Sequence, residues 1–128
     1  MTAYAVVDTN VLVSSLLTSN SESPTVRIIE LIREQKLIPL YSEYLLSEYR
    51  EVLRRGKFSL PVDVCEGIVT LFTRYGRHFE PSGIDPDLPD PDDPPIFLIT
   101  METRDLDSYL VTGNIRHYPL LDYVVTPN

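Results

Sequence analysis

The sequence predicts an α/β fold, namely a three-layer α/β/α sandwich with a central, mostly parallel sheet. Short β-rich segments alternate with amphipathic helical segments along the chain, an order typical of a parallel sheet covered on both faces. Two of the β-rich segments end abruptly in polar residues, as strands do at the ligand-binding edge of an open α/β sheet. The 128 residues fit one compact unit, so we expect a single domain over residues 1–128.

The first predicted strand covers residues 3–7 and delivers Asp8 to its carboxyl edge. A short helix or turn, Val11–Leu17, follows directly after the Asp-Thr-Asn sequence. The next helix begins at Ser23-Pro24, because Ser is a good N-cap and Pro suits the first helical position, and it continues to Gln35. The opening segment thus places a carboxylate where open α/β sheets bind ligands.

A second strand and an acidic helix come next. Leu37–Tyr41 is predicted as a strand, in which Pro39 favours an edge position or a strand end. Ser42 caps the following helix, whose apolar residues recur at helical spacing: Leu45, Leu46, Tyr49, Val52 and Leu53. Glu48 lies only about 40° beyond Val52 at 100° per residue, at the margin of the apolar stripe. Glu48 is therefore the acid of this helix best placed to face a site, and a surface Glu paired with an Arg is the alternative.

The middle of the chain contains one more helix and a short strand. The helix begins near Pro61, and its predicted apolar side consists of Val64, Ile68, Leu71, Phe72 and Tyr75. Cys65 falls inside this helix and, as the chain's only cysteine, is expected to be a core thiol rather than a catalytic one. The segment 78–81 is predicted as a strand. His78 is expected to be structural, because no second His or Cys stands at metal-binding spacing.

Residues 81–95 hold most of the prolines, a composition typical of a linker. Asp93-Pro94 nevertheless repeats the N-cap and first-position pattern, so a helix is predicted over residues 96–103. Asp93 would then lie near the positive end of the helix dipole, either as an ordinary cap or as a site residue. Asp90 lies about one turn earlier and is expected to reach the same pocket or to brace the loop.

The last part of the chain repeats the arrangement of the first strand. Residues 108–113 are predicted as a strand and tight turn that deliver Asn114, as the first strand delivers Asp8. A final strand over residues 123–126 completes the sheet. Asp8, Glu48, Asp93 and Asn114 are thereby expected at one edge, and carboxylates gathered without basic partners indicate a hard divalent cation.

Charge limits the classes of function. The net charge of −8 argues against a protein that holds nucleic acid on a broad basic surface. It does not exclude a nuclease, because bound metal ions reverse the local charge. The cations available for a small basic rim are Arg50, Arg54, Arg55, Lys57, Arg116 and His117. No apolar run is long enough for a membrane span and no signal sequence opens the chain, so a cytoplasmic location is expected.

Four segments in order resemble the PIN domain family, and within it the toxin components of toxin–antitoxin systems. They are residues 6–14, 47–53, 90–93 and 109–114, and the resemblance spans nearly the whole chain. It implies a ribonuclease dependent on Mg²⁺ or Mn²⁺, with a cognate antitoxin as partner and RNA as substrate. One departure stands out: the last acidic position of the usual Thr-Gly-Asp pattern is Asn114 here, before a His-aromatic-Pro segment.

The resemblance also implies roles for particular residues. Asp8, Glu48 and Asp93 would be catalytic, and the metal ligands would be Asp8, Asp93, Asp90, Asp92 and Asn114. Thr9 and Asn10 would orient the Asp8 carboxylate or bond the waters of the metal. Arg116 and His117 follow the site-forming turn, where a contact to the substrate phosphate and a purely structural role both stay open. Asn114 brings no negative charge, which puts a second metal ion and full turnover in question.

Two other functions compete with the nuclease. A phosphoryl-transfer enzyme with an aspartyl nucleophile typically has a second Asp two positions after the first, and Asn10 stands there instead. A PIN-like module that binds RNA or protein with weak or no catalysis is the other alternative, supported by Asn114. The resemblance also implies a possible homodimer, for which Tyr41, Tyr44 and Tyr49 offer a face unless they belong to the core.

Overall fold

The computed structural model describes residues 2–81, 95–118 and 121–128. Its centre is a five-stranded sheet in the order β3-β2-β1-β4-β5, and every neighbouring pair is parallel. The strands are β1 (Ala3–Val7), β2 (Leu37–Tyr41), β3 (Arg77–His78), β4 (Tyr109–Val111) and β5 (Val124–Val125). Strand order reverses at β1, which lies between β2 and β4, and such a switch point is where open α/β sheets place their ligands.

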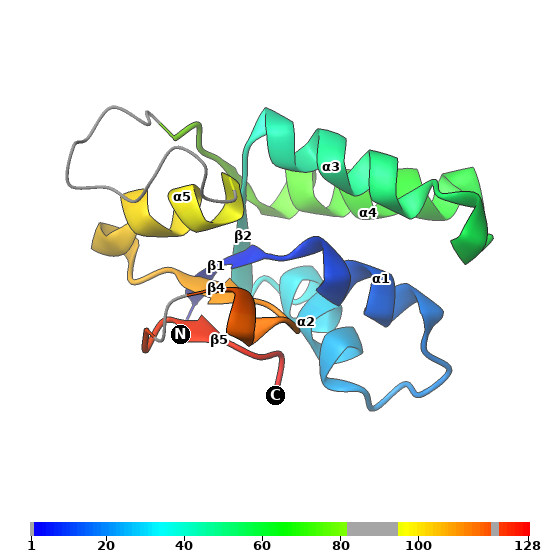
Figure 1. Ribbon diagram of the computed structural model, residues 1–128, viewed down its shortest axis with the longest axis horizontal. Coiled ribbons are helices and arrows are strands. Elements are labelled where there is room, and N and C mark those ends of the chain that lie inside the picture. The colour runs from blue at the N-terminus through cyan, green and yellow to red at the C-terminus, as the bar shows by residue number, and fades with distance from the viewer. Residues whose placement is uncertain (1, 82–94, 119–120) are drawn as a thin grey trace.

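Helices cover both faces of this sheet, so the predicted α/β sandwich is confirmed. The α-helices are α1 (Thr9–Leu17), α2 (Pro24–Arg33), α3 (Glu43–Leu53), α4 (Val62–Tyr75) and α5 (Pro95–Glu102), and the short 3₁₀ helices are η1 (Gly56–Phe58), η2 (Arg104–Leu106) and η3 (Ile115–His117). Helix α5 packs on β1 and β4, while α2 and α4 pack on β2. In Figure 1, α5 and α2 lie on opposite sides of β1.

The core joins the central strands to the helices on either face. Val6, Leu40 and Leu110 of three neighbouring strands are fully buried. The Tyr49 ring of α3 packs edge-on against Phe72 of α4, with their centroids 5.2 Å apart. Cys65 is buried as predicted and its thiol donates to the Leu53 carbonyl oxygen at 3.4 Å. No helix in the described part of the chain is long and apolar enough to cross a bilayer.

Helix α1 begins two residues earlier than predicted, at Thr9 rather than Val11. The Val11 N–H donates to the Asp8 carbonyl oxygen at 3.0 Å, so Asp8 occupies the N-cap position and the helix starts directly at the strand end. The Asp8 side chain makes no hydrogen bond to the helix N-terminus and is left to the site. The backbone therefore has almost no slack between the strand and the helix that carry this carboxylate.

Pro39 lies in the middle of an interior strand, which corrects the predicted edge or strand-end position. Proline is tolerated there because β3 pairs with β2 only from Leu40 onward. Tyr41, two residues after Pro39, turns its carbonyl oxygen to β3, where it accepts from Phe79 N–H at 2.8 Å. Since alternate residues face the same side, the missing N–H of Pro39 faces the side on which β3 has not yet begun to pair.

The predicted face of α4 is corrected at Val64, and for Tyr49 the stated alternative of a core position holds. Val64 is exposed, and the buried face of α4 consists of Cys65, Ile68, Val69 and Phe72. Tyr49 is fully buried in the core and so cannot contribute to a homodimer face, whereas Tyr44 is 60% exposed.

Strand β3 covers two residues and starts at Arg77 instead of His78. His78 stacks on Tyr41 and bonds to Glu80 at 2.5 Å, contacts of a structural kind.

Candidate active site

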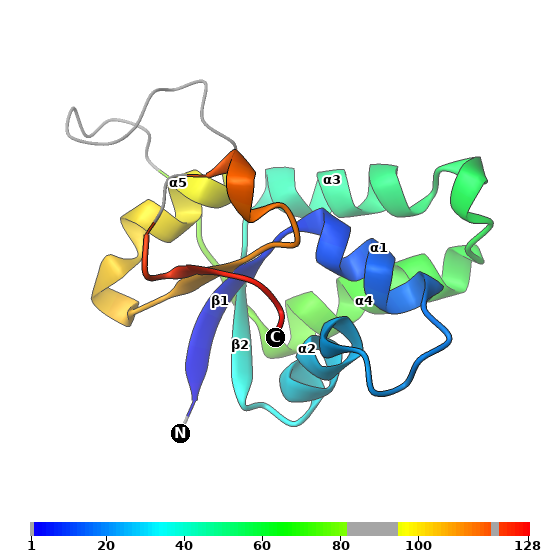
Figure 2. The same ribbon diagram turned by 60° about the horizontal axis from the view of Figure 1, so that its bottom comes forward.

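Asp8 lies at the carboxyl end of β1, at the switch point of the sheet. Its N–H donates to the Val111 carbonyl oxygen of β4 at 2.9 Å, which ties the two central strands together where both end. In Figure 2 the turn after β4 lies beside the passage from β1 into α1. The two strand ends that the sequence singled out are therefore neighbours.

Three neutral side chains hold one oxygen of the Asp8 carboxylate. Oδ2 accepts from Thr112 Oγ1 at 2.8 Å, from Asn10 Nδ2 at 3.2 Å and from the Tyr118 hydroxyl at 3.3 Å. None of these donors carries a charge, and within the described residues no ion pair joins Asp8 to a Lys or Arg. The carboxylate is thus oriented by its neighbours while its negative charge stays uncompensated.

Glu48 is joined to the same edge through Thr9. The buried Thr9 hydroxyl donates to Glu48 Oε2 at 2.8 Å, and this bond connects the first residue of α1 to the middle of α3. Glu48 is half-buried, as its position at the margin of the apolar stripe predicts. Asp8 lies at the edge of the sheet itself, and the next residue, Thr9, holds Glu48 at the same edge through its hydroxyl group.

Two tyrosines that the sequence did not single out for the site lie near these acids. The Tyr49 hydroxyl donates to the Val7 carbonyl oxygen, and Tyr118 donates to Asp8. Burial, then the negative charges of Asp8 and Glu48, raise the pKa of the Tyr49 phenol. Burial, the Asp8 charge and the Asp8 hydrogen bond raise the pKa of Tyr118, with Glu48 adding to it. Both phenols therefore stay protonated, and the pKa of each is raised by the charges of both carboxylates.

Sequence reasoning had only a faint signal for these tyrosines. Tyr49 follows Glu48 directly, and its helical spacing marked it correctly as an apolar position. Tyr118 lies in the segment after Asn114, where neither strand nor helix periodicity applies. Its role depends on η3 turning the chain back over the end of β1, which composition does not reveal.

The turn after β4 is anchored to α1 by Asn10. The Gly113 N–H donates to Asn10 Oδ1 at 3.0 Å, and the Asn114 N–H donates to Thr112 Oγ1 at 3.0 Å. A Cβ atom on Gly113 would approach Asn10 Oδ1 to 3.3 Å, so glycine lets the turn lie close to α1. Asn10 therefore positions both the Asp8 carboxylate and the turn. The side chain of Asn114 is exposed.

The other predicted site residues are either exposed or outside the described part of the chain. Asp90, Asp92 and Asp93 lie outside the described residues, and so does the side chain of His117. Arg116 is exposed on η3. Among the described residues, no group of three or more His, Cys, Asp or Glu side chains is placed to hold a metal ion. The described part of the site supplies Asp8 and Glu48, two carboxylates without a cationic partner, and this donor set fits a hard divalent cation.

Three arginines of the predicted basic rim have neighbouring acids. Arg50 and Arg54 approach Glu66 Oε2 at 3.5 and 3.4 Å. Arg55 pairs with Glu51 at 2.9 Å, one helical turn away. These arginines therefore match the predicted alternative of solvated surface charge.

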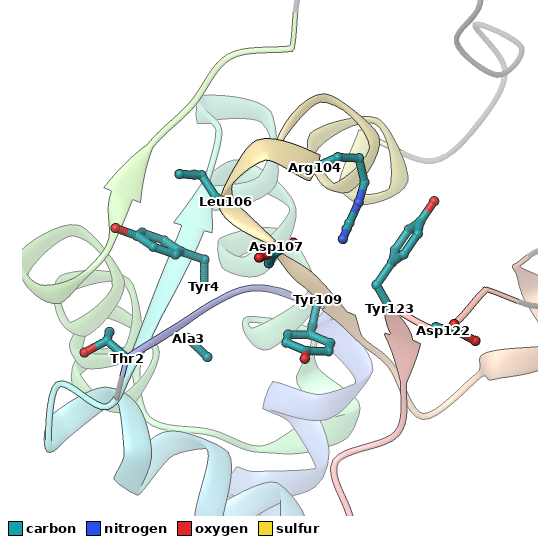
Figure 3. A pocket seen from close by; sticks show the side chains of 9 residues that line it. All are labelled: Thr2, Ala3, Tyr4, Arg104, Leu106, Asp107, Tyr109, Asp122 and Tyr123. Atoms are coloured by element: carbon teal, nitrogen blue, oxygen red, sulfur yellow. The ribbon is translucent and has the colours of Figure 1, made fainter.

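A hollow of about 550 Å³ lies at the amino ends of the strands, at the edge of the sheet opposite to Asp8 (Figure 3). It is lined by residues at the amino ends of β1, β4 and β5, among them Tyr4, Tyr109 and Tyr123, and by η2. Arg104 stacks on the Tyr123 ring there, 3.5 Å from its centroid. None of the predicted site residues that the structure describes lines this hollow, so size alone does not mark the candidate active site.

The fold and the site define a class: open, parallel α/β proteins with paired carboxylates at the switch-point edge of the sheet. A family model described as PIN domain matches residues 4–116. This chain therefore belongs to the PIN domain family, whose members are typically nucleases and usually use divalent metal ions. No curated protein and no solved structure matches the sequence.

Proposed function

We propose that this protein is a divalent-metal-dependent endoribonuclease. The observation that carries the proposal is that Asp8 and Glu48, linked through Thr9, both lie at the switch-point edge of a PIN domain without a cationic partner among the described residues. Asp8 and, as the resemblance implies, Asp93 would hold Mg²⁺ or Mn²⁺ directly, with Asp90, Asp92 and Asn114 as further candidate ligands and Glu48 as the third catalytic acid.

The residues of the chain have distinct parts in this proposal. A bound divalent cation would polarise the phosphodiester and lower the pKa of an attacking water. Asp8 is oriented for binding because Thr112, Asn10 and Tyr118 fix Oδ2 and leave its second oxygen without a described protein partner. Glu48 is held by the Thr9 hydroxyl, and it would bind the metal ion through water or accept a proton from the nucleophile.

Cleavage of single-stranded RNA with Mn²⁺ tests the proposal. Wild-type protein is expected to cleave, and Asp8→Asn to lose at least about a hundredfold in rate because an essential ligand charge is removed. Asp63→Asn is the matched control, since Asp63 is an exposed acid in the first turn of α4. Equal rates for wild type and Asp8→Asn, or absence of Mg²⁺ and Mn²⁺ binding by calorimetry, would overturn the nuclease and favour the binding module that Asn114 suggests.

We further propose that the enzyme is the toxin of a toxin–antitoxin pair acting in the cytoplasm. The support is the resemblance of residues 6–14 and 109–114 to such toxins, together with the PIN domain. With a net charge of −8, the chain would suit a basic antitoxin. Induced expression is expected to arrest growth, and co-expression of a small protein from the adjacent reading frame to relieve it. Arrest that persists in Asp8→Asn would contradict an RNase toxin.

A further inference from the structure

A second, smaller hollow of about 250 Å³ lies next to Asp8 at the carboxyl edge of the sheet. We propose that it binds one nucleobase of the RNA strand beside the scissile phosphate, an inference that rests on the nuclease function proposed above. It would make the enzyme base-selective at one position of its substrate.

Four parts of the chain form this hollow. Asn10 and Ser14 come from α1, Thr25 from the start of α2, and Asn114 from the turn after β4. The last residues of the chain complete the wall, and Figures 1 and 2 show the C-terminus returning to the vicinity of α2. Segments from both ends of the sequence therefore build a concave surface at the same edge as Asp8.

The chemistry of the walls suits a heterocycle better than a phosphate. No charged side chain lines the hollow among the described residues. The polar side chains are amides and hydroxyls, which both donate and accept as the edge of a base requires. Val11 and Pro24 add apolar surface against which a flat ring can pack. The volume is below the range of about 300–1,000 Å³ common for drug-sized ligands, so one ring system fits rather than a whole nucleotide.

Asn10 connects the hollow to the reacting centre. Its Nδ2 donates to Asp8 Oδ2 at 3.2 Å and its Oδ1 accepts from Gly113 N–H at 3.0 Å, while the same side chain lines the hollow. The amide is thus held in place before substrate arrives, and its second N–H stays available for a ligand. A base seated here lies one side chain away from the carboxylate that would bind the metal.

The hollow at the opposite edge of the sheet differs both in the charge of its walls and in its distance from Asp8. It is lined by Arg104, Asp107 and Asp122 and lies at the amino ends of the strands. It therefore provides a control surface, because substitutions there should not affect base selection.

Filling the subsite tests the inference. Ser14→Leu and Thr25→Leu add bulk to two wall residues that make no described contact with Asp8 or Glu48. Sequencing the cleavage sites of a random RNA pool with wild type identifies the selective position. Both variants are expected to reduce the ratio of kcat/KM between preferred and other bases by about tenfold. On an RNA with an abasic nucleotide at that position, their kcat should equal that of wild type. Tyr109→Leu, at the opposite edge, should keep the full selectivity, and Ser14→Leu and Thr25→Leu variants that do so would refute the subsite.

A binding measurement separates this inference from the nuclease itself. Adenosine, guanosine, cytidine and uridine are titrated in turn into ¹⁵N-labelled Asp8→Asn protein without metal. At least one nucleoside is expected to shift the amide signals of Asn10, Ser14, Thr25 and Gly113, and Ser14→Leu to abolish those shifts. If wild type cleaves no RNA, these shifts alone decide: their presence sustains the subsite without the nuclease, and their absence for all four nucleosides refutes it.

Discussion

At the scale of single residues, the site depends on how neutral donors share one carboxylate oxygen. Thr112, Asn10 and Tyr118 all bind Oδ2 of Asp8, so orientation is achieved without neutralising the charge. An Arg in any of these places would compete with a metal ion for the carboxylate. Asn114, at the neighbouring strand end, is also neutral: its side-chain amide has the shape of an aspartate without the negative charge.

Asn114→Asp is expected to tighten Mn²⁺ binding by about tenfold, because the affinity for a hard cation rises with the number of charged ligands. The side chain is exposed, so the added charge costs little in folding. Calorimetry at fixed ionic strength measures the dissociation constant, with Asn20→Asp in an exposed loop as the control for net charge. The same constant for both variants would show that position 114 does not reach the metal.

Tyr49→Phe is expected to alter stability in a pH-dependent way. The pKa of Tyr49 is raised in the folded protein, so its contribution is complete below the unfolded pKa of about 10 and is lost as pH rises toward the folded value. Wild type should therefore become less stable above about pH 10. Tyr49→Phe should lose about 1–2 kcal/mol at pH 7, because the Val7 carbonyl loses its donor, and should decline less steeply above pH 10.

Urea denaturation from pH 7 to pH 11 measures both effects. Tyr44→Phe is the matched control, since Tyr44 lies on the same helix and is 60% exposed. Parallel pH profiles for wild type and Tyr49→Phe would contradict the assigned cause.

At the scale of elements, close backbone contact between α4 and β2 sets where β3 begins. Gly76 is the C-cap that follows helix α4, and its N–H donates to the Phe72 carbonyl oxygen at 2.8 Å. A Cβ atom at this position would lie 2.4 Å from that oxygen and 2.5 Å from the Pro39 carbonyl oxygen. Both are backbone atoms that cannot move aside alone, so Gly76 permits the chain to pass from α4 directly alongside β2.

Gly76→Ala is expected to destabilise the protein by at least about 2 kcal/mol, since the backbone of two elements must shift to relieve the overlap. Gly67→Ala is the matched substitution inside α4, where a Cβ meets nothing within 4 Å. It should stabilise the protein by about 0.5–1 kcal/mol through helix propensity. Chemical denaturation gives both values, and equal stability of the two variants would refute the steric argument.

The elements also show what the sequence predicts and what it does not. The strand ending in Asp8, the Ser42 cap and the Glu48 margin follow from local patterns, and Ser42 Oγ indeed accepts from Leu45 N–H at 3.1 Å. Pro39 was wrongly predicted because its tolerance depends on where β3 starts to pair, a non-local property. The α4 face was misplaced at Val64, which is exposed, while Val69 is buried: the two side chains are identical, and only packing selects which of them faces the core.

At the scale of the whole molecule, the net charge disfavours RNA binding, whereas the function proposed for this fold requires it. The chain carries a net charge of −8, and Arg50, Arg54 and Arg55 each have an acidic neighbour. Long-range attraction to RNA would therefore be weak, and under the proposed function binding would come from the carboxyl edge of the sheet and a metal ion held there. Such an enzyme would depend on local contacts, including the proposed base subsite, to select its substrate.

This arrangement predicts a shallow salt dependence of RNA binding. Each phosphate contact to a single strand contributes about −0.7 to the slope of log K against log salt, so one or two contacts give a slope no steeper than about −1.5. Binding of a short RNA to Asp8→Asn, at constant Mn²⁺ and varied KCl, measures the slope. Arg116→Gln, on the exposed η3 beside the site, should make it shallower by about 0.7, because one phosphate contact is lost. Arg54→Gln should leave it unchanged, since Arg54 lies against Glu66 on the outer helices. A slope of about −3 or steeper would instead require several phosphate contacts and a basic surface that the described residues do not provide.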